Sequence, residues 1–93
     1  MTELIVGQCY QTVHKQINHV LVGTNSTYYL FFQFKDTGIT GYKLVKNATI
    51  VNNRLVFEKT IAHSYHLYGI KKYMEIHNIV IPYLKMILEA CTC

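Results

Sequence analysis

The stretch from 63 to 73, HSYHLYGIKKY, concentrates side chains that could do chemistry: two histidines, three tyrosines and two lysines. These residue types are compatible with a metal or acid–base site, with a nucleic-acid contact, or with the first turns of an amphipathic helix. His66, Ile70 and Tyr73 recur at spacings of four and three residues, which is the period of one helical face. Because this spacing turns the histidine and the lysines to different sides, we expect a helix start rather than a catalytic cluster.

Aromatic and basic side chains form two candidate contact surfaces for a macromolecular partner. On the expected helix, Tyr68, Lys71 and Lys72 share the side opposite to the apolar stripe. An aromatic ring beside lysines can stack on a base while the ammonium groups pair with phosphates. The second candidate surface lies on the expected sheet and comprises Tyr28, Tyr29, Tyr42, Lys43 and Lys46.

Two histidines and two cysteines are considered as a zinc site. His63 and His66 are three residues apart, close enough to share a metal on one helical face, and Cys91 and Cys93 supply two thiols. Against this, a Cys-x-Cys pair does not match the usual spacing of zinc ligands, and nothing in the sequence brings the two pairs together. We therefore expect no metal and no cofactor. Cys9 lies in an apolar stretch and is interpreted as a small core residue.

An enzyme would need a nucleophile or an acid–base pair, and the sequence offers little for either. It contains five acidic residues, none in a convincing pair, and no nucleotide-binding or hydrolase motif. We therefore expect a protein that is not an enzyme. A small metal-independent ribonuclease that uses histidines with a lysine or a tyrosine is one alternative. Its candidate residues are His14, His19, His63 and His66, with Tyr10 or Lys15 nearby.

The composition indicates a folded chain with a modest positive charge. Of the 93 residues, 51% are apolar and 15% are charged, unlike a disordered chain. The formal net charge of +4 is spread evenly, without the basic cluster of a dedicated DNA-binding protein. The start lacks the features of a signal peptide, and no segment is apolar for long enough to span a membrane. We expect a cytoplasmic protein without membrane contact, and three cysteines without framework spacing agree with a reducing compartment.

The first two thirds of the chain predict an antiparallel β-meander of about five strands. Residues 27–34, TYYLFFQF, are apolar on both faces and predict a central, covered strand. Asn52 and Asn53 separate two apolar runs, and asparagine tolerates the positive φ angles of a two-residue hairpin. Further strands are expected at 4–13, with Gly7 as a bulge, and at 18–23, 39–46, 48–51 and 54–60.

The last third of the chain predicts helix. Ser64 can cap the first turn, and Pro82 interrupts the helical pattern, so we expect a kink near 78–81 or a second helix from Pro82. The segment after Pro82 is apolar almost all round and needs cover on two sides. We expect a second copy to supply one of them, in a homodimer whose contact residues are Tyr83, Leu84, Ile87 and Leu88.

The expected fold is therefore α+β in one domain, 1–93. Residues 1–62 form the sheet, which is either open or curled into a partly open barrel. Residues 63–93 form a kinked helix or a helical hairpin.

The leading functional expectation is a small non-enzymatic binding protein that self-associates and occupies a surface on a larger protein or nucleoprotein complex. Asn, Ile, Lys and Tyr make up about a third of the chain, as in genes of AT-rich base composition. Such a chain fits a phage or mobile-element inhibitor of a host nucleic-acid-handling or defence complex, of the anti-CRISPR type. The alternative is a module that binds single-stranded nucleic acid directly through tyrosines and lysines on the sheet, as small β-barrels do.

Overall fold

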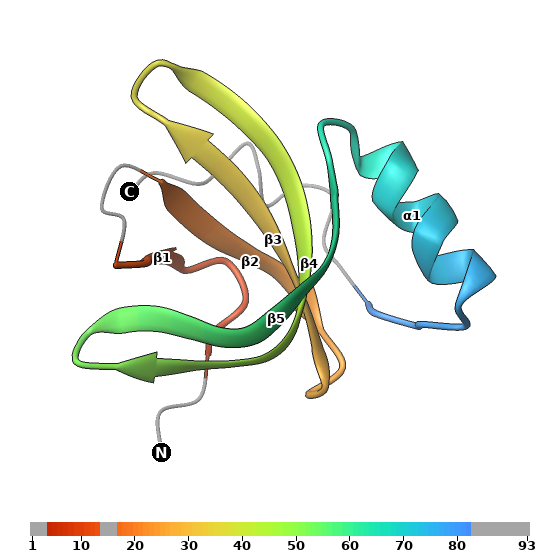
Figure 1. Cartoon of the computed structure of the whole chain (residues 1–93), viewed down its shortest axis with the longest axis horizontal. Helices are drawn as coiled ribbons and strands as arrows, with labels where there is room; N and C mark the ends of the chain where they lie inside the picture. Colours follow the sequence, from red (N-terminus) through yellow and green to blue (C-terminus); the bar gives the residue numbers. More distant parts are fainter. Residues whose placement is uncertain (1–3, 14–16, 83–93) are drawn as a thin grey trace.

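A computed structural model describes residues 4–13 and 17–82, in which five strands form one antiparallel sheet in sequence order. The strands are β1 (Cys9–Gln11), β2 (Asn18–Thr24), β3 (Tyr28–Lys35), β4 (Gly38–Val51) and β5 (Arg54–Ser64). The sheet curls into a half-barrel, so that β1 at one edge contacts β5 at the other (Figure 1). The helix α1 (Leu67–Ile76) lies against the outer, convex face. The predicted α+β class is confirmed in this form: a mostly β fold with one short helix in the described part.

The hairpin between β4 and β5 turns on two residues with positive φ. Asn52 has a φ of 52° and Asn53 a φ of 62°, which is the left-handed pair that a type I′ turn requires. This confirms the hairpin predicted from the two asparagines. The predicted break between strands at 39–46 and 48–51 is wrong, because β4 continues through Asn47. That residue adopts a φ of 55°, and pairing with β5 resumes directly beyond it.

The first strand is much shorter than the predicted segment 4–13. Gly7 has a φ of 96° and lies in a turn, where its N–H donates to the carbonyl of Leu21 at 2.8 Å. A chain that turns at this point cannot continue one strand from residue 4, so β1 begins only at Cys9.

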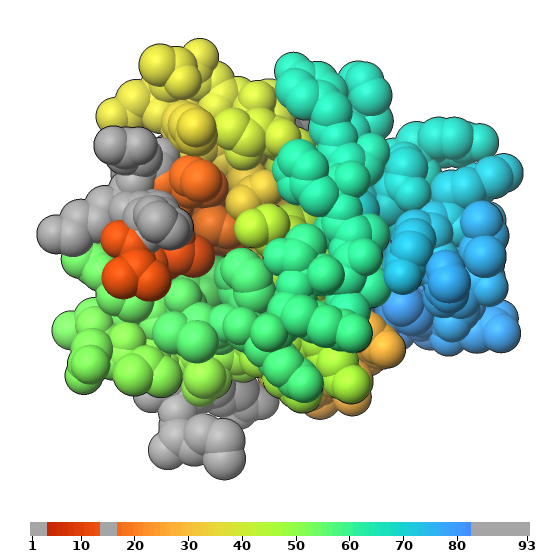
Figure 2. All heavy atoms as spheres, viewed as in Figure 1, coloured from red at the N-terminus to blue at the C-terminus, as the bar shows by residue number. Residues whose placement is uncertain are grey.

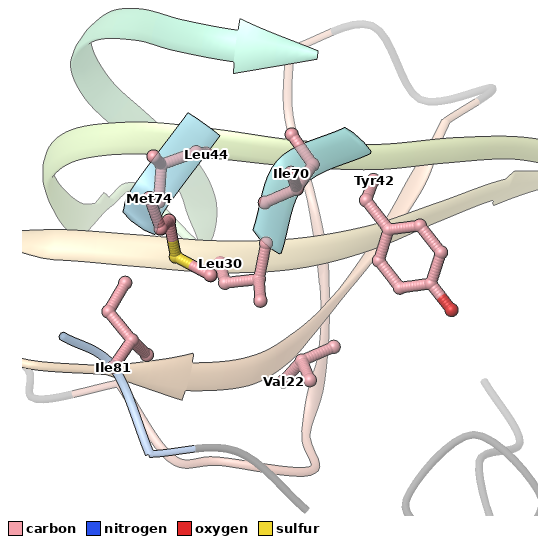
Figure 3. Packing of buried hydrophobic residues seen from close by; sticks show 7 residues of the cluster. All are labelled: Val22, Leu30, Tyr42, Leu44, Ile70, Met74 and Ile81. Carbon is pink, nitrogen blue, oxygen red and sulfur yellow. The ribbon is translucent and has the colours of Figure 1, made fainter. Parts of the chain in front are cut away.

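A hydrophobic core lies between the outer face of the sheet and α1. Ile70 and Met74 of the helix point toward Leu30 and Leu44 of the sheet (Figure 3). The predicted helical stripe is therefore confirmed at Ile70. The buried members of this outer cluster are Val22, Leu30, Tyr42, Leu44, Ile70, Met74 and Ile81.

The helix begins and ends differently from the prediction. His66 is its N-cap and makes no capping hydrogen bond with its side chain. The prediction of Ser64 as the cap is wrong, because Ser64 is the last residue of β5. The helix ends at Ile76, and Asn78 adopts a φ of 55°. The predicted kink near 78–81 is therefore not found: the chain has already left the helix before Pro82.

The residues after α1 return to the sheet. Ile81 is 6% exposed in the outer cluster, and it lies beside Gly23 of β2, where a Cβ would overlap the carbonyl of Pro82. In Figure 2, α1 and these residues, in blue, form one side of the molecule, opposite the two long hairpins in yellow and green. The second helix expected from Pro82, and the expected dimer contacts Tyr83, Leu84, Ile87 and Leu88, lie outside the described residues.

A second apolar cluster fills the inside of the half-barrel. Because β2 and β3 contribute to both clusters, the central strand predicted at 27–34 is covered on both faces, as expected. The buried members of this inner cluster are Leu4, Leu21, Phe31, Val45, Ala48 and Leu55. Within the described ranges, no helix is long and apolar enough to cross a membrane.

Candidate binding site on the inner face

Polar side chains lie at one end of the inner, concave face, beyond the inner cluster. His19 of β2 is paired in register with Gln33 of β3. Lys43 of β4 is paired on one side with Phe31, an inner-cluster residue, and on the other side with His63 of β5. Residues that are directly opposite each other in an antiparallel sheet point to the same face. The curl of the sheet therefore gathers polar groups from four strands at one end of its interior.

His19 is a buried, neutral histidine. It is 1% exposed, and the side-chain amide nitrogen of Gln33 donates to its Nε2 atom at 2.9 Å. The neutral ring therefore carries its proton on Nδ1. The backbone of Ile17 is a hydrogen-bond partner of the ring, in a geometry that falls short of a well-formed bond. Burial and the nearby charge of Lys43 lower the pKa of His19 to about 4, although the backbone of Ile17 acts in the opposite direction.

Lys43 is a half-buried cation. Its ammonium nitrogen lies 5.0 Å from the centroid of the Phe57 ring, which is a cation–π contact. Burial lowers the pKa of Lys43, because the charged form loses contact with water. Among the described residues, no acidic side chain lines either of the two pockets that Lys43 borders. An anion that entered these pockets would therefore meet an uncompensated positive charge.

Two pockets open at this end of the inner face and meet at Ile17 and Lys43. The apolar pocket has a volume of about 260 Å³ and is lined mainly by aliphatic and aromatic side chains, with His19 among them. The polar pocket has a volume of about 360 Å³ and is lined by Gln33, Lys35, Thr40 and His63 in addition to the two shared residues. Both volumes are close to those of small-molecule sites in proteins.

The residues of the second predicted contact surface, on the sheet, lie on different faces of it. Tyr42 is 9% exposed in the outer cluster, and burial raises its pKa. Lys46 is paired with Tyr28, which packs against the same outer cluster. Lys43 lies on the inner face, where Tyr29 packs against the inner cluster. The three residues Tyr42, Lys43 and Lys46 therefore do not form one contact surface.

Of the residues predicted to form a contact surface on the helix, Tyr68 and Lys72 lie together. Tyr68 is 71% exposed, and the ammonium nitrogen of Lys72 lies 5.9 Å from the centroid of its ring. Lys71 is half-buried. Tyr65, just before the helix, is also exposed and makes an edge-on ring contact with His66.

The candidate zinc ligands and the cysteines are placed as follows. His63 lines the polar pocket, whereas His66 contacts Tyr65 at the start of α1. In the part of the chain that the structure describes, no group of three or more histidine, cysteine or acidic residues could hold a metal. Cys9 is half-buried and disulfide-bonded, which differs from the small core residue that we expected. The other two cysteines of the sequence, Cys91 and Cys93, lie outside the described residues.

Sequence reasoning missed most of this site. It did not single out Gln33, Lys35 or Thr40, and it named His19 only among several histidines. One signal was available, because His19 and Gln33 each interrupt an otherwise apolar strand. Whether the two meet depends on strand register, since a shift of one residue would turn them to opposite faces.

No family model matches the sequence, and neither a curated protein nor a solved structure is significantly similar to it.

Proposed function

We propose that the protein is a non-enzymatic binding protein whose inner face holds single-stranded nucleic acid. The observation that carries this proposal is Lys43, a half-buried cation between two pockets whose described lining residues include no acid. Burying a charge is costly unless a partner compensates it, and a phosphate group has the right sign to do so. Lys35 and His63 line the polar pocket beside it, and the formal net charge of +4 favours polyanions in general.

Aromatic contact is the second requirement for holding a single strand. Proteins that bind single strands combine a positively charged groove with aromatic rings on which bases stack. Phe57 supplies such a ring, because it lies under Lys43 and lines the apolar pocket. The inner face thus offers charge and ring together, whereas the residues of the second predicted contact surface lie on different faces of the sheet.

The state of His19 on the inner face favours binding over hydrolysis. Acid–base catalysis near neutral pH works best with a group whose pKa lies near the working pH. The pKa of His19 is about 4, and Gln33 occupies its Nε2 atom. Two further ribonuclease candidates, Tyr10 and His66, line neither pocket. His19 is therefore best used as a neutral hydrogen-bonding group.

The test compares two substitutions on the same strand that remove the same charge from opposite faces. Fluorescence anisotropy would measure the binding of labelled oligo(U) and oligo(dT) of about 12 nucleotides, at about 50 and about 200 mM salt. We expect Lys43→Gln to weaken binding about tenfold and to reduce the slope of affinity against salt by about 1. Lys46→Gln, on the outer face, should change the affinity less than about twofold.

Two results would contradict the proposal. One is equal weakening by Lys43→Gln and Lys46→Gln, which would indicate a diffuse charge effect rather than a site. The other is the failure of the wild-type protein to bind either oligonucleotide at low salt. Circular dichroism and thermal unfolding of both variants would confirm that they remain folded.

A second candidate function, an inhibitor that docks on a larger protein complex, is favoured by the exposed side of α1. There Tyr68 is 71% exposed with Lys72 beside its ring, and Tyr65 is 59% exposed nearby. Exposed tyrosines beside a basic group are typical of contact residues. A photo-reactive amino acid at position 68 should give one discrete cross-linked protein in expressing cells. The same product from a probe at the exposed Val51, or no product, would remove this candidate.

A further inference from the structure

The two inner-face pockets adjoin but differ in chemistry. Val13, Ile17, Leu55 and Phe57 are among the walls of the apolar pocket. The polar pocket instead presents ammonium, imidazole, amide and hydroxyl groups. A molecule that fills both pockets must therefore be apolar or aromatic at one end and anionic at the other.

We propose that the two pockets form one site for a single nucleotide, with its base in the apolar pocket and its phosphate in the polar pocket. Lys43 borders both pockets and lies between the two halves of this site. The inference rests on the proposed function and deepens it, because it assigns which part of a bound strand enters which pocket.

The apolar pocket fits a base better than an aliphatic chain. His19 is 1% exposed and is held by an edge-on contact with Phe31, with ring centroids 5.7 Å apart. Phe57 lines the same pocket and adds a ring on which a base can stack. An aliphatic chain would fill the walls but could not stack on this ring.

The polar pocket fits a phosphate better than a neutral group. Lys43 and His63 lie directly opposite each other across β4 and β5, and Lys35 lines the same pocket. Phosphate oxygens accept several hydrogen bonds, so they can pair with both ammonium groups at once. A carboxylate would supply the charge with fewer acceptor atoms.

The test uses three small probes on the full chain: 5′-UMP, uridine and inorganic phosphate. Their affinities would be measured by titration of ¹⁵N-labelled protein with NMR detection. We expect UMP to bind at least about tenfold more tightly than uridine or phosphate, because only UMP fills both pockets. The ¹⁵N signals of the His19 ring should shift with UMP and uridine but not with phosphate.

Substitutions should separate the two halves of the site. Phe57→Leu should weaken UMP and uridine but not phosphate, and Lys43→Gln should weaken UMP and phosphate but not uridine. Lys46→Gln should change none of the three affinities. If Phe57→Leu fails to fold, Val13→Phe narrows the apolar pocket from a residue that is 74% exposed. Val13→Phe should likewise weaken the binding of UMP and uridine but not of phosphate.

The outcomes distinguish the inference from the proposed function. Equal affinities for UMP and phosphate would overturn the inference of a nucleotide site. An equal loss of affinity for all three probes in the Phe57→Leu variant would do the same. Oligonucleotide binding that still depends on Lys43 would then leave the proposed function intact. If the oligonucleotides also fail to bind, both proposals are overturned.

Discussion

The two faces of the sheet are formed by the same strands but differ in the side chains that cover them. The outer face is covered by α1 and by the residues after it, and its contacts are apolar throughout the cluster around Leu30 and Ile70. The inner face is apolar only as far as Phe31 and Leu55, and beyond them it ends in His19, Gln33 and Lys43. In the described part of the chain, apolar side chains thus complete the outer face, whereas polar side chains end the inner face.

This difference indicates that the two faces have different roles, one in stability and one in function. Burial of apolar surface stabilises the fold wherever it occurs, so α1 on the outer face contributes mainly to stability. Burial of the Lys43 ammonium group and of the His19 ring disfavours their charged forms, and the pKa of each group is lowered accordingly. Ionisable groups that a fold buries in this way are typical of a functional site.

The stabilising role of the outer face is tested most strongly by removing a contact between α1 and the sheet. Ile70 is 1% exposed, whereas Ile76 on the same helix is 69% exposed. We expect Ile70→Ala to lower the free energy of unfolding by about 3–4 kcal/mol through lost burial and the cavity left behind. Ile76→Ala should change it by less than about 0.5 kcal/mol. Urea unfolding followed by circular dichroism would measure both, and equal losses would mean that α1 does not depend on this packing.

On the inner face, the pKa of His19 predicts a loss of stability in acid. The pKa falls from 6.5 in the unfolded chain to about 4 in the folded protein. Between these values the unfolded chain binds more protons, so stability is fully present above about pH 6.5 and falls as the pH is lowered toward about 4. At about 1.36 kcal/mol for each pH unit, the loss approaches about 3 kcal/mol. Urea unfolding at a series of pH values would measure it.

Two histidine variants provide the control for this pH dependence. His19→Gln should be less stable at pH 7 but should show a flatter dependence between pH 6.5 and 4. His63→Gln, at an exposed position, should keep the slope of the wild-type protein. If His19→Gln keeps that slope as well, a different group is responsible, and His19 is not held neutral by the fold.

The outer helix and the β4–β5 hairpin were easier to predict from sequence than the inner site, because their signals are local. The spacing of Ile70 within a helical stripe and the two asparagines of the β4–β5 hairpin depend on neighbours along the chain. The inner site depends on register between strands: His19 meets Gln33 only because residues 14 positions apart are paired. No local pattern fixes that distance.

Backbone conformations at single residues account for the other differences. Asn47 adopts a left-handed conformation within β4, so a strand continues where the sequence suggested a break. Asn78 does the same after α1 and allows Ile81 to return to the sheet. Asparagine tolerates this conformation but also occurs in many others, so its presence alone does not predict either outcome.

The contact between Gly23 and the residues after α1 gives a smaller effect that should be confined to the outer face. A Cβ at Gly23 would overlap the carbonyl of Pro82 and touch the side chain of Ile81. We expect Gly23→Ala to cost about 2 kcal/mol by displacing this segment. In methyl NMR spectra, the signals of Ile81 and Met74 should move while that of Leu55 on the inner face stays in place. Equal movement of Leu55 would show that the two faces are not independent.

The exposed side of α1 should show the smallest effect on stability. The ring of Tyr68 and the ammonium group of Lys72 are exposed, so their cation–π contact is worth about 0.5 kcal/mol. A double-mutant cycle with Tyr68→Ala and Lys72→Ala would measure this coupling in urea unfolding. Neither variant should alter oligonucleotide binding, because α1 packs on the outer face and the pockets are lined by residues of the inner face. A loss of oligonucleotide affinity on Tyr68→Ala would move the nucleic-acid contact to the helix. A coupling well above about 1 kcal/mol would mean that Tyr68 is desolvated by the chain itself, and would remove it as a contact residue for a partner.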